Sequence, residues 1–155
     1  MELAIYPTVK FIHILSATLL FGTGLGSAFY MLMTYRSGNM IAMAETNRIV
    51  VIADYIFTAP MVIIQLVTGL YLLNYLGLEW TSPWSLSVLG LYAFVGACWI
   101  PVVWLQIALR DRAKQLQKPD SHYRYRMKIW MTLGFLAFPA VVVLYAFMVY
   151  KPFLG

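Results

Sequence analysis

The sequence predicts an all-α integral membrane protein, built as a bundle of four transmembrane helices. The chain is 62% hydrophobic and only 11% charged, with a mean hydropathy of +0.76, whereas a soluble domain carries roughly 25% charged residues. Charged residues and histidines are absent from four long stretches, residues 14–35, 55–78, 80–109 and 129–150. Each stretch can cross a hydrocarbon core of about 30 Å. Because a backbone in lipid must satisfy its own hydrogen bonds, and these apolar runs do not alternate as barrel strands do, we expect helices.

The first helix is expected near residues 7–34 and contains glycines spaced for close packing. Gly22 and Gly26 lie four residues apart, with Gly24 between them. Small residues at this spacing let helix backbones approach closely in lipid. We therefore expect the glycine face to pack on a neighbouring helix or on a second copy of the chain in a homodimer. The segment around Glu2 lacks the pattern of a signal peptide, so we expect this helix to be retained.

The second helix is expected near residues 47–76 and carries a line of polar side chains. Asp54, Thr58, Gln65 and Thr68 recur at helical spacing, which predicts that they share one face. A carboxylate within a membrane span costs roughly 2.5–3.5 kcal/mol and is normally paired, protonated or in contact with water. Asp54 is therefore the most informative residue of this helix. Three interpretations stay open: pairing with basic residues at the helix ends, a proton or ion pathway, and a role in gating or partner binding.

The third and fourth helices are expected near residues 84–109 and 127–150. A proline lies near the middle of each of the last three helices, at Pro60, Pro101 and Pro139. Proline lacks the N–H that an α-helix needs and clashes with the preceding turn, so each position predicts a kink or a freed carbonyl. Such irregular backbone in a membrane usually lines a cavity or is covered by neighbouring helices.

The distribution of basic residues predicts the topology. Nine of the 11 basic residues lie in or beside two connections, those after the first and after the third helix. They are Arg36 and Arg48 at the former, and Arg110, Arg112, Lys114, Lys118, Arg124, Arg126 and Lys128 at the latter. Because Lys and Arg in short loops stay cytoplasmic, we expect both termini outside the cytoplasm of a bacterial-type inner membrane. The net charge of +5 is then a topology signal. It indicates no nucleic-acid partner, although the second basic loop would also attract anionic lipid headgroups.

His13 is the only histidine within a predicted span and lies toward the outer end of the first helix. At this depth Lys10, Tyr92, Tyr145 and Met148 are expected to complete an inward pocket. That set suits a porphyrin, with the imidazole as axial ligand, Met148, water or a dimer-related histidine opposite, and Lys10 or a tyrosine on a propionate. Three interpretations of His13 stay open: a hydrogen-bonded structural histidine, a ligand of heme b, and a ligand of copper or another metal.

The chain resembles a family of predicted small four-helix integral membrane proteins of unknown function. The resemblance rests on the Lys10-x-x-His13 opening, Asp54 and the Gln65-x-x-x-Gly69 pattern. The opening is in turn similar to CopD-type copper-resistance membrane proteins and to HemJ-type protoporphyrinogen oxidases, the latter linked to bound heme. This similarity implies His13 as a heme or metal ligand. The lysine that HemJ-type proteins use on a later helix has no counterpart here, which argues against protoporphyrinogen oxidation.

These observations lead to two functional hypotheses for a single transmembrane domain, 1–155. The first is a b-type heme-binding redox or heme-handling protein with His13 as axial ligand and a redox partner that the sequence does not identify. The alternative is a non-enzymatic transporter-like or accessory membrane protein, linked by the resemblance to copper, that uses Asp54 and Gln65. Enzymatic activity and substrate stay open. The only cysteine, Cys98, lies inside the third helix, so no intrachain disulfide can form.

Overall fold

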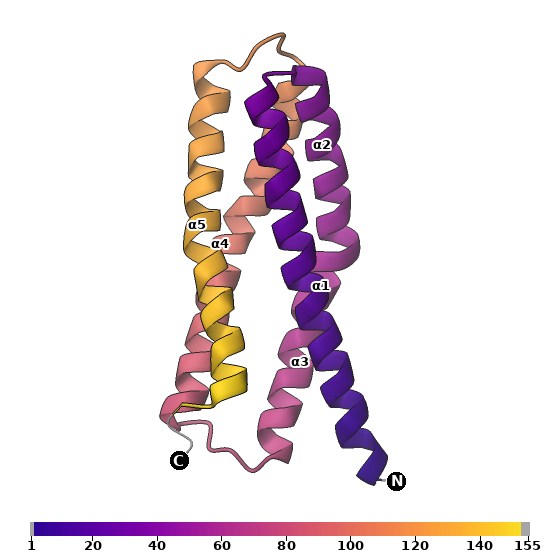
Figure 1. The fold of residues 1–155 in the computed structure, drawn as a ribbon, viewed down its shortest axis with the longest axis vertical. Coiled ribbons are helices and arrows are strands. Elements are labelled where there is room, and N and C mark those ends of the chain that lie inside the picture. Colours follow the sequence, from indigo (N-terminus) through magenta and orange to yellow (C-terminus); the bar gives the residue numbers. More distant parts are fainter. Residues whose placement is uncertain (1, 153–155) are drawn as a thin grey trace.

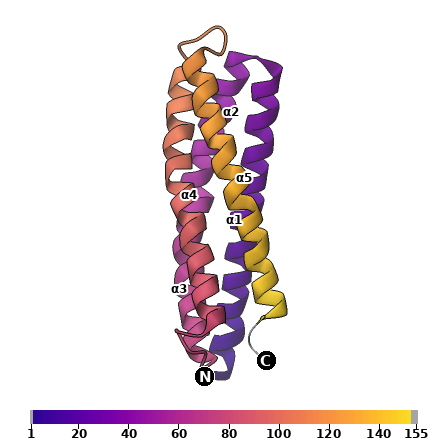
Figure 2. The same ribbon diagram turned by 90° about the vertical axis from the view of Figure 1, so that its left-hand side faces the viewer.

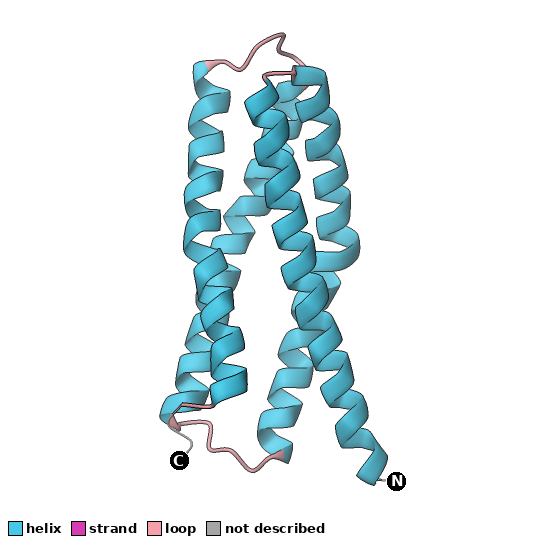
Figure 3. Ribbon diagram, viewed as in Figure 1, coloured by secondary structure: helices cyan, strands magenta, loops and turns pink. Residues whose placement is uncertain are grey.

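The computed structural model describes residues 2–152, with side chains from residue 5 onward, and this part of the chain consists of helices joined by short connections (Figure 3). The elements are α1 (Glu2–Ser37), α2 (Met40–Ala53), the π-helical turn η1 (Asp54–Thr58), α3 (Ala59–Tyr75), α4 (Pro83–Ala113) and α5 (Ser121–Tyr150). Because α2, η1 and α3 follow one another without a break, they form one rod, and residues 2–152 contain four such rods. The predicted all-α fold is confirmed.

All four rods are long and apolar enough to span a membrane. They extend beyond the predicted ranges at the end that carries the basic residues, where α2 begins at Met40 and α5 at Ser121. Side chains cap both starts. Asn39 Oδ1 accepts a hydrogen bond at 3.0 Å, and Asp120 Oδ1 accepts one at 2.7 Å, each from a backbone N–H two or three residues later. The predicted helices begin too late because the first turns of α2 and α5 are polar, and hydropathy does not detect polar turns.

The π-helical turn η1 interrupts the second rod near its middle. Pro60 follows it and has no N–H to donate to the carbonyl of Ile56, four residues earlier. The Ala59 N–H instead donates to the carbonyl of Asp54, five residues earlier, which is the hydrogen bond of a π-helix. The irregularity predicted from Pro60 is therefore present. The mid-span prolines of α4 and α5 lie inside continuous α-helix.

The four rods stand side by side and alternate in direction (Figures 1 and 2). Both termini and the α3–α4 loop lie at one end of the bundle, which we call the terminal end. The α1–α2 turn and the α4–α5 loop lie at the other, which we call the basic end because most of the basic residues belong to it. That the basic end faces the cytoplasm stays a prediction.

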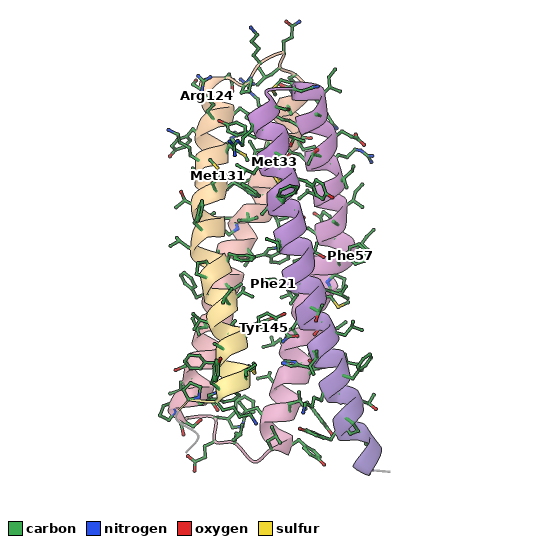
Figure 4. The ribbon with its side chains drawn as sticks, in the orientation of Figure 1. Phe21, Met33, Phe57, Arg124, Met131 and Tyr145 are labelled. Atoms are coloured by element: carbon green, nitrogen blue, oxygen red, sulfur yellow. The ribbon has the colours of Figure 1, made fainter. Side chains whose placement is uncertain are left out.

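The hydrophobic core lies toward the basic end. Its buried members are Met31, Met40, Met43, Val50, Leu109, Ala113, Tyr123, Met127 and Trp130. α4 packs along α5 and against α2, while α1 packs along α3. Toward the terminal end the α1–α3 and α4–α5 pairs diverge (Figure 1). There Phe21 of α1 faces α5 (Figure 4), with its ring centre 5.0 Å from that of Phe138 and 5.6 Å from that of Tyr145.

The glycines of α1 do not pack on another helix of the same chain. A Cβ atom at Gly22, Gly24 or Gly26 would have no neighbouring atom within 4 Å apart from the local helix itself. The expected use of these positions for packing inside the bundle is therefore not found; Gly22 and Gly26 lie on the side of α1 opposite His13, which meets α3. A homodimer contact through these glycines stays a prediction.

Candidate functional site

Asp54 is buried in the η1 turn, with 5% of its surface exposed. Its Oδ1 accepts a hydrogen bond from the Thr58 hydroxyl at 2.8 Å, whereas Oδ2 has no hydrogen-bond partner among the described residues. Ion pairs within residues 5–152 join Arg48 to Glu45, Arg110 to Asp111 and Arg112 to Asp120. The expected pairing of Asp54 with a basic residue is not found there. Asp54 lies six residues, about 9 Å, farther along the rod than Arg48, and the basic side chains pair with acids at the helix ends.

Two further buried polar atoms without a hydrogen-bond partner lie on α4, at Trp99 Nε1 and Gln106 Oε1. Gln106 is 3% exposed, and its side chain faces the Asp54 carboxyl group. Trp99 and Asp54 line a small cavity of about 30 Å³, together with Tyr55, Ala59 and Val103. A water molecule needs roughly 10–15 Å³ of such space. The cavity is therefore large enough for a water molecule, but its lining is apolar, and Asp54 Oδ2 and Trp99 Nε1 are buried behind that lining.

The polar residues of the second rod do not form the single face that their spacing predicts. Asp54 faces Gln106 of α4, while Gln65 and Thr68 hydrogen-bond to His13 of α1. The π-helical turn is the physical reason. It accommodates one extra residue in a turn, and one residue corresponds to a rotation of about 100° around the helix. The predicted polar line is thereby divided into an Asp54 cluster and a His13 cluster.

The His13 cluster joins α1 to α3 through neutral hydrogen bonds. His13 Nδ1 lies 2.8 Å from Thr68 Oγ1, and Nε2 lies 3.0 Å from Gln65 Nε2. Because the Thr68 hydroxyl donates to the carbonyl of Ile64 at 2.6 Å, it accepts from His13 Nδ1–H. His13 Nε2 then accepts from the Gln65 amide. Gln65 Oε1 in turn accepts from the hydroxyl of Ser16, which is 1% exposed.

Gly69 provides the space for the His13 ring. A Cβ atom at Gly69 would lie 3.1 Å from His13 Cε1, closer than ordinary van der Waals contact. The Gln65-x-x-x-Gly69 pattern therefore has a local physical meaning. Gln65 binds one ring nitrogen, and Gly69, one turn later on the same face of α3, lets the ring approach the backbone.

The other residues predicted around His13 have different contacts. The Lys10 side chain is exposed, with Nζ 5.7 Å from the centre of a tyrosine ring one turn earlier. The Tyr92 hydroxyl donates to a backbone carbonyl of α3 at 2.7 Å. Tyr145 makes a ring contact with α1 one turn or more beyond His13, and Met148 is exposed. The contacts of His13 are with Thr68 and Gln65, so a pocket made of these four side chains stays a prediction.

The fit of His13 to a heme or metal is partial. Its Nδ1–H is held by a hydroxyl and its Nε2 carries the lone pair, which is the arrangement typical of a metal-bound histidine. The Gln65 amide, however, occupies Nε2. Within the part of the chain that the structure describes, no three His, Cys, Asp or Glu side chains are grouped to hold a metal ion. A metal at His13 would therefore need Gln65 to move and another ligand to be supplied.

Four residues of these clusters are absent from the sequence-based site. Ser16 and Gly69 complete the His13 cluster, and Trp99 and Gln106 border Asp54. Gln106 carried a usable signal, because an amide side chain is rare in an apolar stretch such as 80–109. Which helix it faces does not follow from its position in the sequence.

Comparison with known proteins identifies the family but adds no activity. Residues 7–152 match the family described as predicted integral membrane protein (DUF2269). No curated protein and no solved structure matches the chain. The similarity of the Lys10-x-x-His13 opening to CopD-type and HemJ-type proteins stays an expectation. Since the match covers nearly the whole chain and its four helices are suited to a membrane, the protein belongs to the DUF2269 family of predicted integral membrane proteins.

Proposed function

We propose that this protein is a transporter-like or accessory membrane protein in which Asp54 binds and releases a proton within the bilayer. The observation that carries the proposal is a buried carboxyl group that forms no ion pair with the described residues and has only neutral polar side chains, those of Thr58 and Gln106, beside it. An uncompensated carboxylate in an apolar interior costs several kcal/mol, whereas the neutral acid is much less costly. Such a group holds a proton until water or a cation reaches it.

The neighbours of Asp54 support proton exchange through water. The cavity beside the carboxyl group is bordered by Trp99 and lies close to Gln106, and both side chains have a buried polar atom without a partner. Water that reached Oδ2 after a side-chain movement would supply the hydrogen bond that this oxygen lacks. A carboxyl group that alternates between a dry and a wet neighbourhood is the usual element of a membrane proton relay.

The His13 cluster provides a second polar position along the same rod. Gln65 lies 11 residues beyond Asp54, or about 16 Å along the helix axis. Between them the Tyr92 hydroxyl of α4 bonds to the carbonyl of Val62. The two clusters therefore shorten the apolar distance between polar groups along the second rod. This supports movement of a proton or a small cation toward the terminal end.

The test compares wild-type protein with Asp54→Asn in proteoliposomes that contain a pH-sensitive dye. We expect a proton flux above that of empty liposomes for the wild type and its loss in Asp54→Asn. Glu45→Gln is the matched control, because it also removes one acidic group from the same rod but at an exposed position paired with Arg48. Unchanged flux in a folded Asp54→Asn protein, or no flux in the wild type, would contradict the proposal.

A second proposal is ligation of heme b by His13. The support for it is the ring orientation, in which Thr68 holds Nδ1–H and leaves the lone pair on Nε2. When bound, heme would supply one-electron redox chemistry. Here His13 would donate to the iron and Thr68 would fix the ring, once Gln65 had released Nε2.

Absorption spectra of the protein purified in detergent from heme-replete cells test this second proposal. We expect a Soret band in the wild type, its loss in His13→Ala and its retention in His122→Ala, which removes the other histidine at the opposite end of the bundle. Gln65→Ala should raise heme occupancy because Nε2 becomes free. Wild-type protein without a Soret band would overturn the proposal.

A further inference from the structure

A basic cavity lies at the basic end of the bundle, far from both polar clusters. Its volume is about 290 Å³, and it is lined by Arg112, His122 and Arg126. Arg112 lies in the last turn of α4. His122 and Arg126 lie on the first turns of α5, four residues apart, so they point to the same side of that helix. Two helices that pack along each other therefore direct three basic side chains into one space.

The basic side chains of this cavity are only partly neutralised. Arg112 forms an ion pair with Asp120, the residue that caps α5, and Asp120 also lies near His122. The side chains of Arg126 and His122 form no hydrogen bond or ion pair with the described residues. The cavity thus has two guanidinium groups and an imidazole but one nearby carboxylate, that of Asp120, which leaves a net positive charge and free N–H donors.

The depth of the cavity matches the position of lipid headgroups. Arg126 lies three residues before the uncharged stretch that begins at Ile129, which is about 4.5 Å along the helix axis. Tyr125 beside it is exposed, as aromatic side chains at a membrane interface commonly are. The guanidinium groups are therefore placed where the phosphates of a bilayer lie.

We propose that Arg112, His122 and Arg126 form a binding site for a phosphate group, supplied either by an anionic lipid headgroup or by a soluble phosphate compound. Guanidinium groups bind phosphate through two parallel N–H···O bonds, and an imidazole N–H adds a third donor. The cavity lies between the last turn of α4 and the first turns of α5, beside the predicted spans, where a lipid headgroup and a soluble anion are both within reach. Asp120 holds the Arg112 guanidinium group in place, and the Arg126 guanidinium group is free to bind the phosphate.

The experiment measures the binding of two probes to the detergent-purified protein, phosphatidic acid by native mass spectrometry and inorganic phosphate by calorimetry. We expect Arg126→Gln to weaken binding of the phosphate group about tenfold, the effect of losing one charged hydrogen bond. Arg36→Gln is the matched control, since it removes the same charge at the same end from an exposed position outside the cavity. His122→Asn is a second variant, because it alters the site at an exposed residue that the fold does not use.

The two probes distinguish the sources of the phosphate group. Phosphatidic acid retained by wild type and Arg36→Gln but lost by Arg126→Gln identifies a lipid site, with phosphatidylcholine as the neutral-lipid comparison. Saturable binding of inorganic phosphate with the same variant dependence identifies a soluble ligand. Equal weakening by Arg36→Gln and Arg126→Gln would show attraction by net charge alone and overturn the proposal. Absence of binding by both probes would also overturn it.

Discussion

The two polar clusters differ in how many of their polar side-chain atoms have a hydrogen-bond partner. His13 has a partner on each ring nitrogen, and Gln65 uses both ends of its amide, one for His13 and one for Ser16. Asp54 instead leaves Oδ2 unpartnered beside a cavity. A satisfied buried group contributes to stability, whereas an unsatisfied one costs roughly 1–3 kcal/mol. The His13 cluster therefore holds α1 on α3. In the Asp54 cluster, water, a proton or a cation could become the missing partner of Oδ2.

Gly69→Ala should destabilise the protein through His13. The added methyl group would lie 3.1 Å from Cε1, so the ring must shift and lengthen its bonds to Thr68 and Gln65. We expect a loss of about 1–3 kcal/mol, the usual cost of overpacking. Thermal unfolding in detergent measures it. Gly90→Ala is the matched control, because a Cβ atom there meets no neighbour and should be neutral or stabilising. Equal melting temperatures for the two variants would contradict the assigned contact.

The sequence singles out His13, Asp54, Gln65 and Thr68 correctly as polar residues of the spans, but not their partners. Helical spacing specifies which residues share a face of one helix. It does not specify which neighbouring helix that face meets, nor that Gln106 of α4 would lie beside Asp54. The pocket expected around His13 stays a prediction, because it grouped residues by depth alone.

At the scale of secondary structure elements, the ends and irregularities of the helices position both clusters. Uncharged stretches were enough to predict four spans, since lipid leaves the backbone no alternative to a helix. They could not reveal the polar first turns of α2 and α5, which depend on the capping side chains of Asn39 and Asp120. Pro60 predicted an irregular turn but not its form. The π-helical form decides that Asp54 faces α4.

Asp120→Asn should change the pH dependence of stability. The Tyr123 backbone N–H and then Arg112 hold the pKa of the Asp120 carboxyl below its ordinary value. A lowered pKa in the folded state means a contribution to stability that is present above the unfolded pKa and is lost as the pH falls through the folded pKa. The variant should therefore melt lower than wild type at neutral pH and approach it in acid. Asparagine keeps the capping oxygen, so the helix start itself is preserved.

Melting temperatures measured from neutral to acidic pH check this expectation. Asp111→Asn serves as a comparison, because Asp111 pairs with the adjacent Arg110 but caps no helix. A difference in melting temperature between wild type and Asp120→Asn that is the same at every pH would contradict the linkage between the Asp120 charge and folding.

At the scale of the whole molecule, the bundle is asymmetric along its length. The buried core lies at the basic end, whereas the helix pairs diverge toward the terminal end and are bridged there by the ring of Phe21 (Figures 1 and 4). The Asp54 cluster lies between these regions. Positioned beside a firmly packed end and a looser one, it can remain structurally fixed while its access to water changes. The orientation of the chain in the membrane therefore matters for the proposed function, because the orientation decides from which side a proton would enter.

The orientation can be measured with one introduced cysteine at a time. The positive-inside rule predicts that Gln117→Cys, in the loop at the basic end, faces the cytoplasm and that Glu79→Cys, in the α3–α4 loop, faces outward. In intact spheroplasts a membrane-impermeant thiol reagent should label Glu79→Cys at once and Gln117→Cys only after permeabilisation. The wild type is its own control, because its one cysteine, Cys98, is buried and should stay unlabelled. The reverse order of labelling would place the basic end outside.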